Sequence, residues 1–102
     1  MIVNFDEIEI NSIDYGGGNV YYYNNKPFSG VIVEYNSDGI LIGEIAVLNG
    51  SRHGRCALYY DSGQIQEENF ISYNRPYGLL KEWAEDGSLI NEIDFGDEHQ
   101  PA

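Results

Sequence analysis

Histidine, cysteine and paired carboxylates are the side chains of this sequence that could carry proton-transfer, nucleophilic or metal chemistry. Histidine occurs only at His53 and His99, and cysteine only at Cys56. Neither histidine has an organised set of polar neighbours, so we expect His53 to be an exposed residue of a connecting segment and His99 to belong to a frayed acidic terminus. A single cysteine cannot form an intramolecular disulfide, and we expect Cys56 to be a small, buried apolar residue.

Paired carboxylates are more frequent, as at Glu67–Glu68 and Glu85–Asp86. A glycosidase needs two such groups about 5 to 10 Å apart across a cleft. A chain of 102 residues has little room for that cleft, and an acid-rich surface supplies carboxylate pairs at random. The Gly16–Gly18 run lacks the Lys and Ser or Thr of a phosphate-binding loop and is interpreted as a turn or bulge. The sequence therefore predicts a protein without catalytic activity, cofactor or metal.

The composition is strongly acidic. Seventeen Asp and Glu residues against five Lys and Arg residues give a formal net charge of −12. The aromatic content of 14%, with nine tyrosines, is typical of a folded chain and not of an acidic disordered tail. Such a surface repels phosphate backbones and anionic lipids and attracts basic proteins. We therefore expect a cationic protein partner, and neither nucleic acid nor a membrane.

The N-terminal stretch MIVNFDEIEI carries acids where a signal peptide has a basic segment and an apolar run. No stretch approaches the roughly 18 apolar residues that a membrane span requires. The single cysteine fits a reducing compartment. Together these features predict a cytoplasmic location.

Three stretches that begin at Gly30, Gly54 and Gly78 are versions of one unit of 24 residues. A second glycine column has the same spacing, and three further columns keep one residue class. These columns are Gly39, Gly63 and Gly87; Tyr35, Tyr59 and Trp83; Leu41, Ile65 and Leu89; and Glu44, Glu68 and Glu92. A period of this length indicates a repeat architecture, in which units stack because none can bury its own apolar face.

Each unit has the pattern of a β-hairpin. A short run leads to a turn with the sequence NSDG, DSG or EDG, and a second run follows it. Residues 79–83 resemble one turn of an amphipathic helix, but so short a helix is marginal in water. Apolar residues alternate at 41, 45 and 47 and again at 89, 93 and 95, whereas Asn69 interrupts the alternation and indicates a small bulge.

The segments NNKPFSG, NGSRHG and YNRPYG are predicted to be turn-like connections, with Pro27 and Pro76 ending the preceding strands. The predicted fold is all-β, an antiparallel meander of about three β-hairpin repeats of 24 residues with an N-terminal capping strand or hairpin. The chain is interpreted as a single domain. Its parts are the cap and partial repeat 1–29, the repeats 30–53, 54–77 and 78–96, and the tail 97–102.

The sequence of the first unit resembles that of a known repeat family. Its Gly, Tyr, Gly and Glu follow the pattern G-x4-Y-x3-G-x4-E, and an Asn-Gly connector leads to the next glycine. The residues concerned are Gly30, Tyr35, Gly39, Glu44, Asn49, Gly50 and Gly54. This pattern resembles the MORN-type repeats, in particular the short bacterial variant of antitoxin-like and immunity-like proteins, over about residues 20–96. YNRPYG lacks the Asn-Gly, and FGDEHQPA lacks the closing glycine. The resemblance implies a single-layered or weakly curved antiparallel meander that binds another protein.

We predict an immunity protein or antitoxin that neutralises a cationic toxin domain by covering its active site or substrate surface. A nuclease is the expected kind of target, because its surface must be basic to hold nucleic acid. Aromatic residues beside acids are typical of protein-binding surfaces. The candidate partner-binding residues are Tyr22, Glu34, Tyr60, Glu68, Tyr77, Glu82 and Trp83.

Three alternatives stay open. Tyr35, Tyr59 and Trp83 could be core residues, and the repeated glutamates could either pair with Arg52, Arg75 or Lys81 or form an electronegative stripe for the partner. The alternative function is a structural scaffold that self-associates, because a meander leaves unpaired sheet edges.

Overall fold

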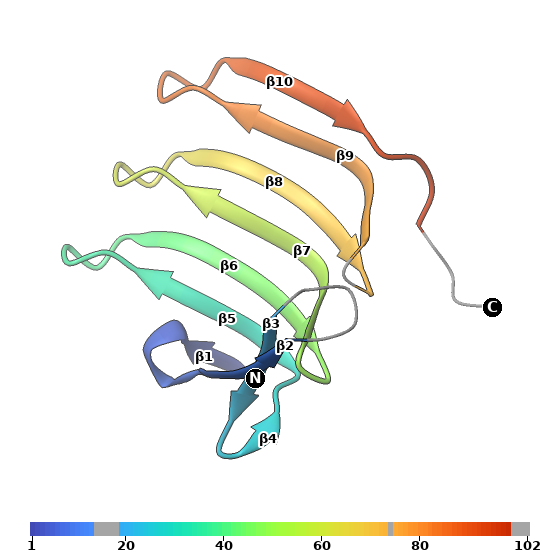
Figure 1. Cartoon of the computed structure of the whole chain (residues 1–102). Coiled ribbons are helices and arrows are strands. Elements are labelled where there is room, and N and C mark those ends of the chain that lie inside the picture. The colour runs from blue at the N-terminus through green and yellow to red at the C-terminus, as the bar shows by residue number, and fades with distance from the viewer. Residues whose placement is uncertain (14–18, 74, 99–102) are drawn as a thin grey trace.

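The computed structural model describes residues 1–13, 19–73 and 75–98. Apart from one 3-10 turn, η1 (Phe5–Glu7), the regular structure of these residues is β-strand, which confirms the all-β prediction (Figure 1). The strands are β1 (Ile2–Asn4), β2 (Glu9–Ile13), β3 (Asn19–Tyr23), β4 (Lys26–Pro27), β5 (Gly30–Tyr35), β6 (Leu41–Leu48), β7 (Ser51–Tyr59), β8 (Ile65–Ser72), β9 (Arg75–Trp83) and β10 (Leu89–Asp94).

The strands form two sheets. The large sheet has the order β1-β5-β6-β7-β8-β9-β10, and the small sheet has the order β2-β3-β4. From β5 to β10 each strand is antiparallel to the next strand along the chain, whereas β1 pairs with β5 in parallel through Ile2 and Val31. The N-terminal cap begins with two separate strands, because η1 separates β1 from β2. Asn4 begins this turn, its side-chain oxygen accepting a hydrogen bond from the Asp6 N–H at 3.0 Å.

The three turns between β5 and β6, β7 and β8, and β9 and β10 are closed by the same two hydrogen bonds. In the first turn the Asn36 N–H donates to the Ile40 carbonyl, and the Gly39 N–H donates to the Asn36 carbonyl. In the second turn the Tyr60 N–H donates to the Gln64 carbonyl, and the Gly63 N–H donates to the Tyr60 carbonyl. In the third turn the Ala84 N–H donates to the Ser88 carbonyl, and the Gly87 N–H donates to the Ala84 carbonyl. The turn glycines have φ values of 79°, 91° and 90°, a region that glycine enters at low cost.

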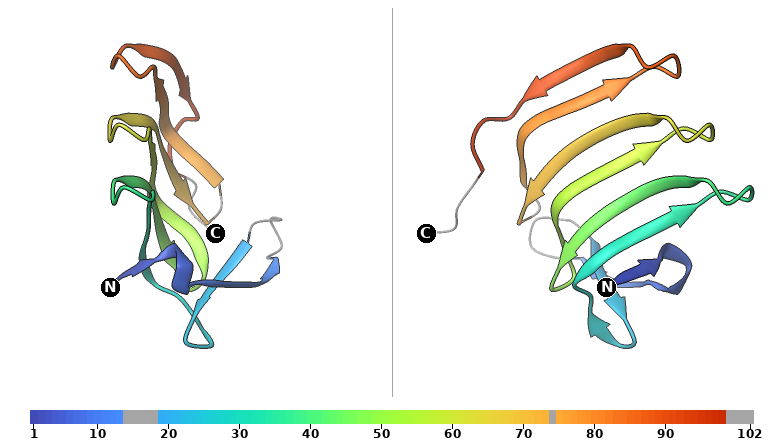
Figure 2. Two further views of the ribbon diagram at one scale, coloured as in Figure 1. Left: turned by 90° about the vertical axis from the view of Figure 1, so that its left-hand side faces the viewer. Right: turned by 180° about the vertical axis from the view of Figure 1, so that it is seen from behind.

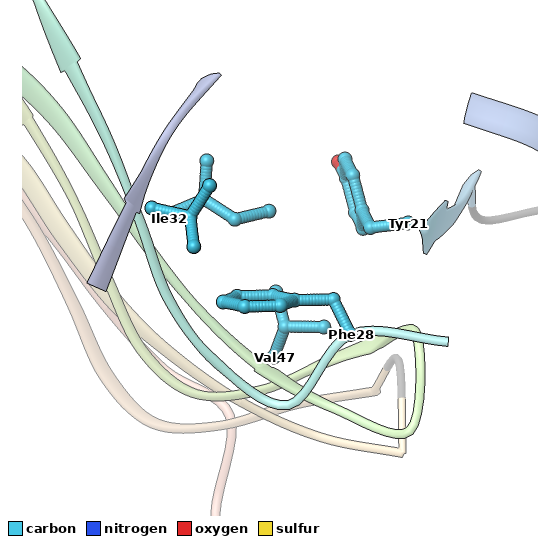
Figure 3. Packing of buried hydrophobic residues seen from close by; sticks show 5 residues of the cluster. Tyr21, Phe28, Ile32 and Val47 are labelled. Atoms are coloured by element: carbon cyan, nitrogen blue, oxygen red, sulfur yellow. The ribbon is translucent and has the colours of Figure 1, made fainter. Parts of the chain in front are cut away.

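The core lies between the small sheet and the β5–β6 end of the large one. Val3, Tyr21, Phe28, Ile32 and Val47 form its buried cluster (Figure 3). The main chain joins the two sheets at the same place, because the Tyr21 N–H donates to the Gly50 carbonyl and the Gly50 N–H donates to the Phe28 carbonyl, at 2.8 and 2.7 Å.

Two strands are longer than the sequence pattern predicted. β7 begins at Ser51 and β9 at Arg75, inside segments expected to be connections, so His53 and Pro76 lie within strands and His53 is half-buried; both expectations were wrong. Gly54 and Gly78, with φ values of 116° and 65°, allow these strands to change direction without ending. A register shift lies between Glu68 and Phe70, where a bulge was expected at Asn69, but the extra residues are in β9 and the same shift recurs between Ile45 and Val47, so it is not particular to Asn69. The predictions for Gly16–Gly18 and His99 lie outside the described residues.

Burial decreases along the large sheet. The small sheet lies against one side of it at the β1–β5 end, and β9 and β10 extend away from that contact (Figure 2). All six residues of β10 are exposed. In residues 1–13, 19–73 and 75–98, no helix has the length and apolar character needed to cross a bilayer.

Candidate protein-binding surface

Acidic side chains from several strands line up across one face of the large sheet. The pairing register places one residue of each strand from β5 to β10 in a row, which we call the carboxylate row: Val33, Glu44, Ala57, Glu68, Lys81 and Glu92. Because adjacent strands are about 4.8 Å apart, Glu44 and Glu68 are separated by roughly 10 Å. The three glutamates that share a column in the sequence therefore lie on one line of the structure.

The carboxylate row lies on the face away from the small sheet. Side chains alternate between the two faces along a strand. Ile32 and Val47, which pack in the core under the small sheet, are therefore on the same face as Glu34 and Gly43, whereas Val33 and Glu44 of the row are on the other face. The small sheet thus covers only the face opposite the row.

Arg55 connects the first two glutamates of the row. Its Nε donates to Glu68 Oε2 at 2.7 Å, and its Nη1 lies 3.8 Å from Glu44 Oε2. The hydroxyl of Tyr59 donates to Glu44 Oε1 at 2.6 Å. Ala57, the residue between the two glutamates, is small and leaves room for the guanidinium. We call these four polar side chains the Arg55 cluster.

The electrostatics of the Arg55 cluster follow from these contacts. The hydrogen bond to Glu68 raises the pKa of Arg55, and burial together with the bond to Glu44 raises the pKa of Tyr59. Arg52, Arg75 and Lys81 were the expected alternatives as partners of these glutamates, whereas Arg55 makes the ion pairs with Glu44 and Glu68. Tyr59, for which a core position was the alternative, is half-buried beside Glu44 and does not belong to the buried cluster.

A hollow with a volume of about 380 Å³ adjoins the row between β8 and β9. It is lined by Glu68, Phe70, Tyr77, Gly78, Leu79 and Lys81, and we call it the Phe70 hollow. The rings of Phe70 and Tyr77 are 6.0 Å apart and tilted by 46°. Gly78 contributes no side chain, so the main chain forms part of the wall. An apolar surface with a carboxylate and an ammonium beside it suits an apolar anchor residue of another protein.

The opposite face carries a second row across the same strands. Its residues are Glu34, Gly43, Leu58, Glu67, Glu82 and Asn91. Glu67 is directly opposite Glu82, and the Asn91 amide donates to Glu82 Oε1 at 3.2 Å. Glu34 and Glu82 are therefore on the other side of the sheet from Glu68 and Tyr77.

The remaining candidates are at the turns and in the small sheet. The Tyr60 hydroxyl donates to the Trp83 carbonyl at 2.7 Å and so links the β7–β8 turn to the end of β9. Tyr22 is half-buried in β3, between Glu9 on β2 and Pro27 on β4. Of the seven predicted residues, Glu68 and Tyr77 line one hollow and Tyr60 is bonded to Trp83, whereas Glu34 and Glu82 are on the opposite face from Glu68 and Tyr22 is in the small sheet.

His53 and Cys56 are both engaged in packing. His53 Nδ1 accepts a hydrogen bond from the Tyr73 N–H at 3.2 Å, and the two rings meet edge to face with centroids 4.8 Å apart. Cys56 is half-buried, and burial raises the pKa of its thiol, which lowers its reactivity. Within the described part of the chain, no three His, Cys, Asp or Glu side chains are placed to hold one metal ion.

Sequence reasoning missed Arg55 and Phe70, which organise this surface. Phe70 did carry a signal, because it breaks the apolar alternation of its unit. No sequence signal marked Arg55, because the positions 24 residues before and after it are Val31 and Leu79 and so do not form a column of one residue class.

Comparisons with protein-family models, with curated proteins and with solved structures give no match for this chain.

Proposed function

We propose that this chain is an acidic protein-binding module built from 24-residue hairpin repeats of the MORN type. The identical hydrogen bonds of the three turns support the repeat interpretation, because they recur at residues 24 apart. The repeated pairing of Glu44 with Ala57 and of Glu68 with Lys81 supports it further.

As its function we propose that of an immunity protein or antitoxin, which neutralises a cationic toxin domain. The observation that carries this proposal is the carboxylate row beside the Phe70 hollow, on a face that the small sheet does not cover. The net charge of −12 would steer a basic partner to the molecule, and an apolar anchor of the partner would occupy the hollow beside the row. A nuclease fits as the target, because its basic substrate surface would meet acidic side chains spaced across a sheet.

Inhibition in this mechanism is steric and electrostatic. The sheet covers the substrate surface of the toxin, its carboxylates take the place of the phosphates, and no covalent step occurs. Because the chain carries a charge of −12, association with a basic protein should be fast at low ionic strength and slower in salt.

The test is co-expression with the product of the neighbouring reading frame, scored by host growth and by recovery of a complex at about 50 mM and 500 mM salt. We expect growth rescue and a complex that weakens in high salt. Tyr77→Ala, which opens the Phe70 hollow, should abolish rescue, whereas Tyr35→Ala, a change at a tyrosine that is 48% exposed and outside the hollow, should preserve it. A harmless neighbour that is not captured would refute the immunity function.

A structural scaffold is the second candidate. It is favoured by the exposed apolar side chains at the β9–β10 end of the sheet, which are Leu79, Leu89, Ile90, Ile93 and Phe95. A stable homo-oligomer that is insensitive to salt in sedimentation experiments would favour this function over the first.

A further inference from the structure

The outer edge of β10 is an open end of the large sheet. Among the described residues, no strand pairs with it beyond β9. Natural sheets commonly protect such edges with lysine, proline or very short strands. The six-residue strand β10 (LINEID) has no lysine or proline, and all its residues are exposed. By contrast, the opposite edge is formed by β1, which has only three residues.

The backbone of β10 is oriented to accept another strand. The Phe95 N–H donates to the Gly78 carbonyl and therefore points toward β9. Since N–H groups alternate in direction along a strand, those of Glu92 and Asp94 point away from β9. The Asp94 carboxylate accepts a hydrogen bond from the Gly96 N–H at 2.8 Å, which closes the end of this edge. Glu92 lies near the centre of the part that remains open.

The earlier hairpins show what this edge would accept. Glu92 occupies the position of Glu44 and Glu68, at 24-residue spacing. Glu44 of β6 is opposite Ala57 of the next strand, β7, and Glu68 of β8 is opposite Lys81 of the next strand, β9. One residue further on, Ile45 is opposite Cys56. The register therefore defines a strand with a cationic or small residue opposite Glu92 and an apolar residue opposite Ile93.

We infer that the outer edge of β10 binds an extended, antiparallel segment of a cationic partner, with Lys or Arg opposite Glu92 and an apolar side chain opposite Ile93. The inference rests on the proposed function for the basic character of the partner, and it adds the mode of docking. Main-chain hydrogen bonds would supply affinity, and the alternating side chains would supply specificity.

Charge complementarity selects this occupant over a second copy of the chain. β10 carries Glu92 and Asp94 and no cation, so two β10 edges in contact would bring acids together. The net charge of −12 adds repulsion between whole chains.

The probe is a synthetic peptide with the sequence of Arg75–Trp83 (RPYGLLKEW), which already forms the equivalent strand against β8. We expect the peptide to shift the backbone amide NMR signals of β10 in the full-length protein and to leave those of β1 unchanged. Replacing its lysine by glutamate should weaken binding about two- to fivefold. The protein variant Glu92→Lys should restore binding of that glutamate peptide, and Glu34→Lys, with the same change in net charge, should not.

Two further peptides separate edge pairing from side-chain docking. Each carries N-methyl groups on alternate amides, one on the set that would face β10 and the other on the set that would face solvent. N-methylation removes a hydrogen-bond donor. Edge pairing therefore requires that the peptide methylated on the amides facing β10 loses binding and that the peptide methylated on the solvent-facing amides keeps it. Equal binding of the two, signal shifts at the Phe70 hollow instead of β10, or no shift at millimolar peptide would overturn the inference.

The outcome is independent of the immunity test. If the neighbouring protein is neutralised but β10 signals do not respond to the peptide, the proposed function stands and this docking mode fails. If the peptide pairs with β10 but no toxin is neutralised, the edge site stands and the proposed function fails.

Discussion

Glu67 on β8 and Glu82 on β9 are directly opposite each other on one face of the sheet. Opposed side chains on adjacent strands have Cβ atoms about 5 Å apart, so the two carboxylates repel. Lys81, the cation next to Glu82 in the sequence, projects to the other face. The Asn91 amide, which donates to Glu82, offsets only part of this repulsion. The sheet therefore retains an unfavourable charge contact on its surface.

Replacing Glu82 by lysine should stabilise the protein. Glu82→Lys turns a repulsive cross-strand contact with Glu67 into an attractive one, worth about 0.5 to 1 kcal/mol in the free energy of unfolding. Glu34→Lys is the matched control, because Glu34 is in the same row but is opposite Gly43. Urea unfolding of both variants measures the difference, and equal effects would show that only net charge matters.

Removal of the Arg55 side chain should destabilise the sheet. Arg55→Met keeps the aliphatic contact but leaves Glu44 and Glu68 without their shared cation, and the pair is partly exposed, so we expect a loss of about 1 kcal/mol. The control is Arg52→Met, a substitution of equal charge outside the Arg55 cluster. A thermal unfolding scan that gives the same shift for both would contradict the assigned role of Arg55.

Gly50 should tolerate substitution much less than Gly39. A Cβ at Gly50 would be 2.7 Å from Val20 Cγ1 and 3.3 Å from the Tyr21 carbonyl oxygen, whereas a Cβ at Gly39 would meet no atom within 4 Å. Both residues have positive φ, so the backbone cost of about 1 kcal/mol is common to both. We expect Gly50→Ala to cost at least about 1 kcal/mol more than Gly39→Ala, because it separates the small sheet from the β6–β7 turn.

Alkaline pH should weaken the fold through Tyr59. Burial raises the pKa of Tyr59, so the folded chain holds the phenolic proton more tightly than the unfolded chain. The contribution to stability is complete below the ordinary tyrosine pKa of about 10 and is lost as pH rises through the higher folded value. Tyr59→Phe should lose less stability between pH 8 and pH 11 than the parent chain or Tyr35→Phe. Urea unfolding at the two pH values makes the comparison.

The local chemistry of the hairpins could be predicted from sequence. Gly39, Gly63 and Gly87 at the turns have positive φ, as their Asp-Gly and Ser-Gly contexts indicate. Residues 79–83, with local helical spacing, form part of β9, because pairing with β8 and β10 outweighs local propensity.

The long-range features could not be predicted in the same way. The parallel pairing of β1 with β5 depends on how η1 turns the chain, and no periodicity records it. Gly54 and Gly78 stand at the predicted boundaries between units, although a positive φ serves equally well to bend a continuous strand. The partner of each residue also depends on the bulges, because the register shift between Glu68 and Phe70 places Lys81, and not Leu79, opposite Glu68.

The decrease in burial along the large sheet has a consequence for local unfolding. The eight buried hydrophobic side chains among the described residues lie between Val3 and Ile71, and none belongs to β9 or β10. The free energy that opposes local opening should therefore fall toward the C-terminal hairpin, whose amides should exchange with solvent deuterium first. A partner strand on β10 would slow that exchange, so binding at this end would also order the least stable part of the chain.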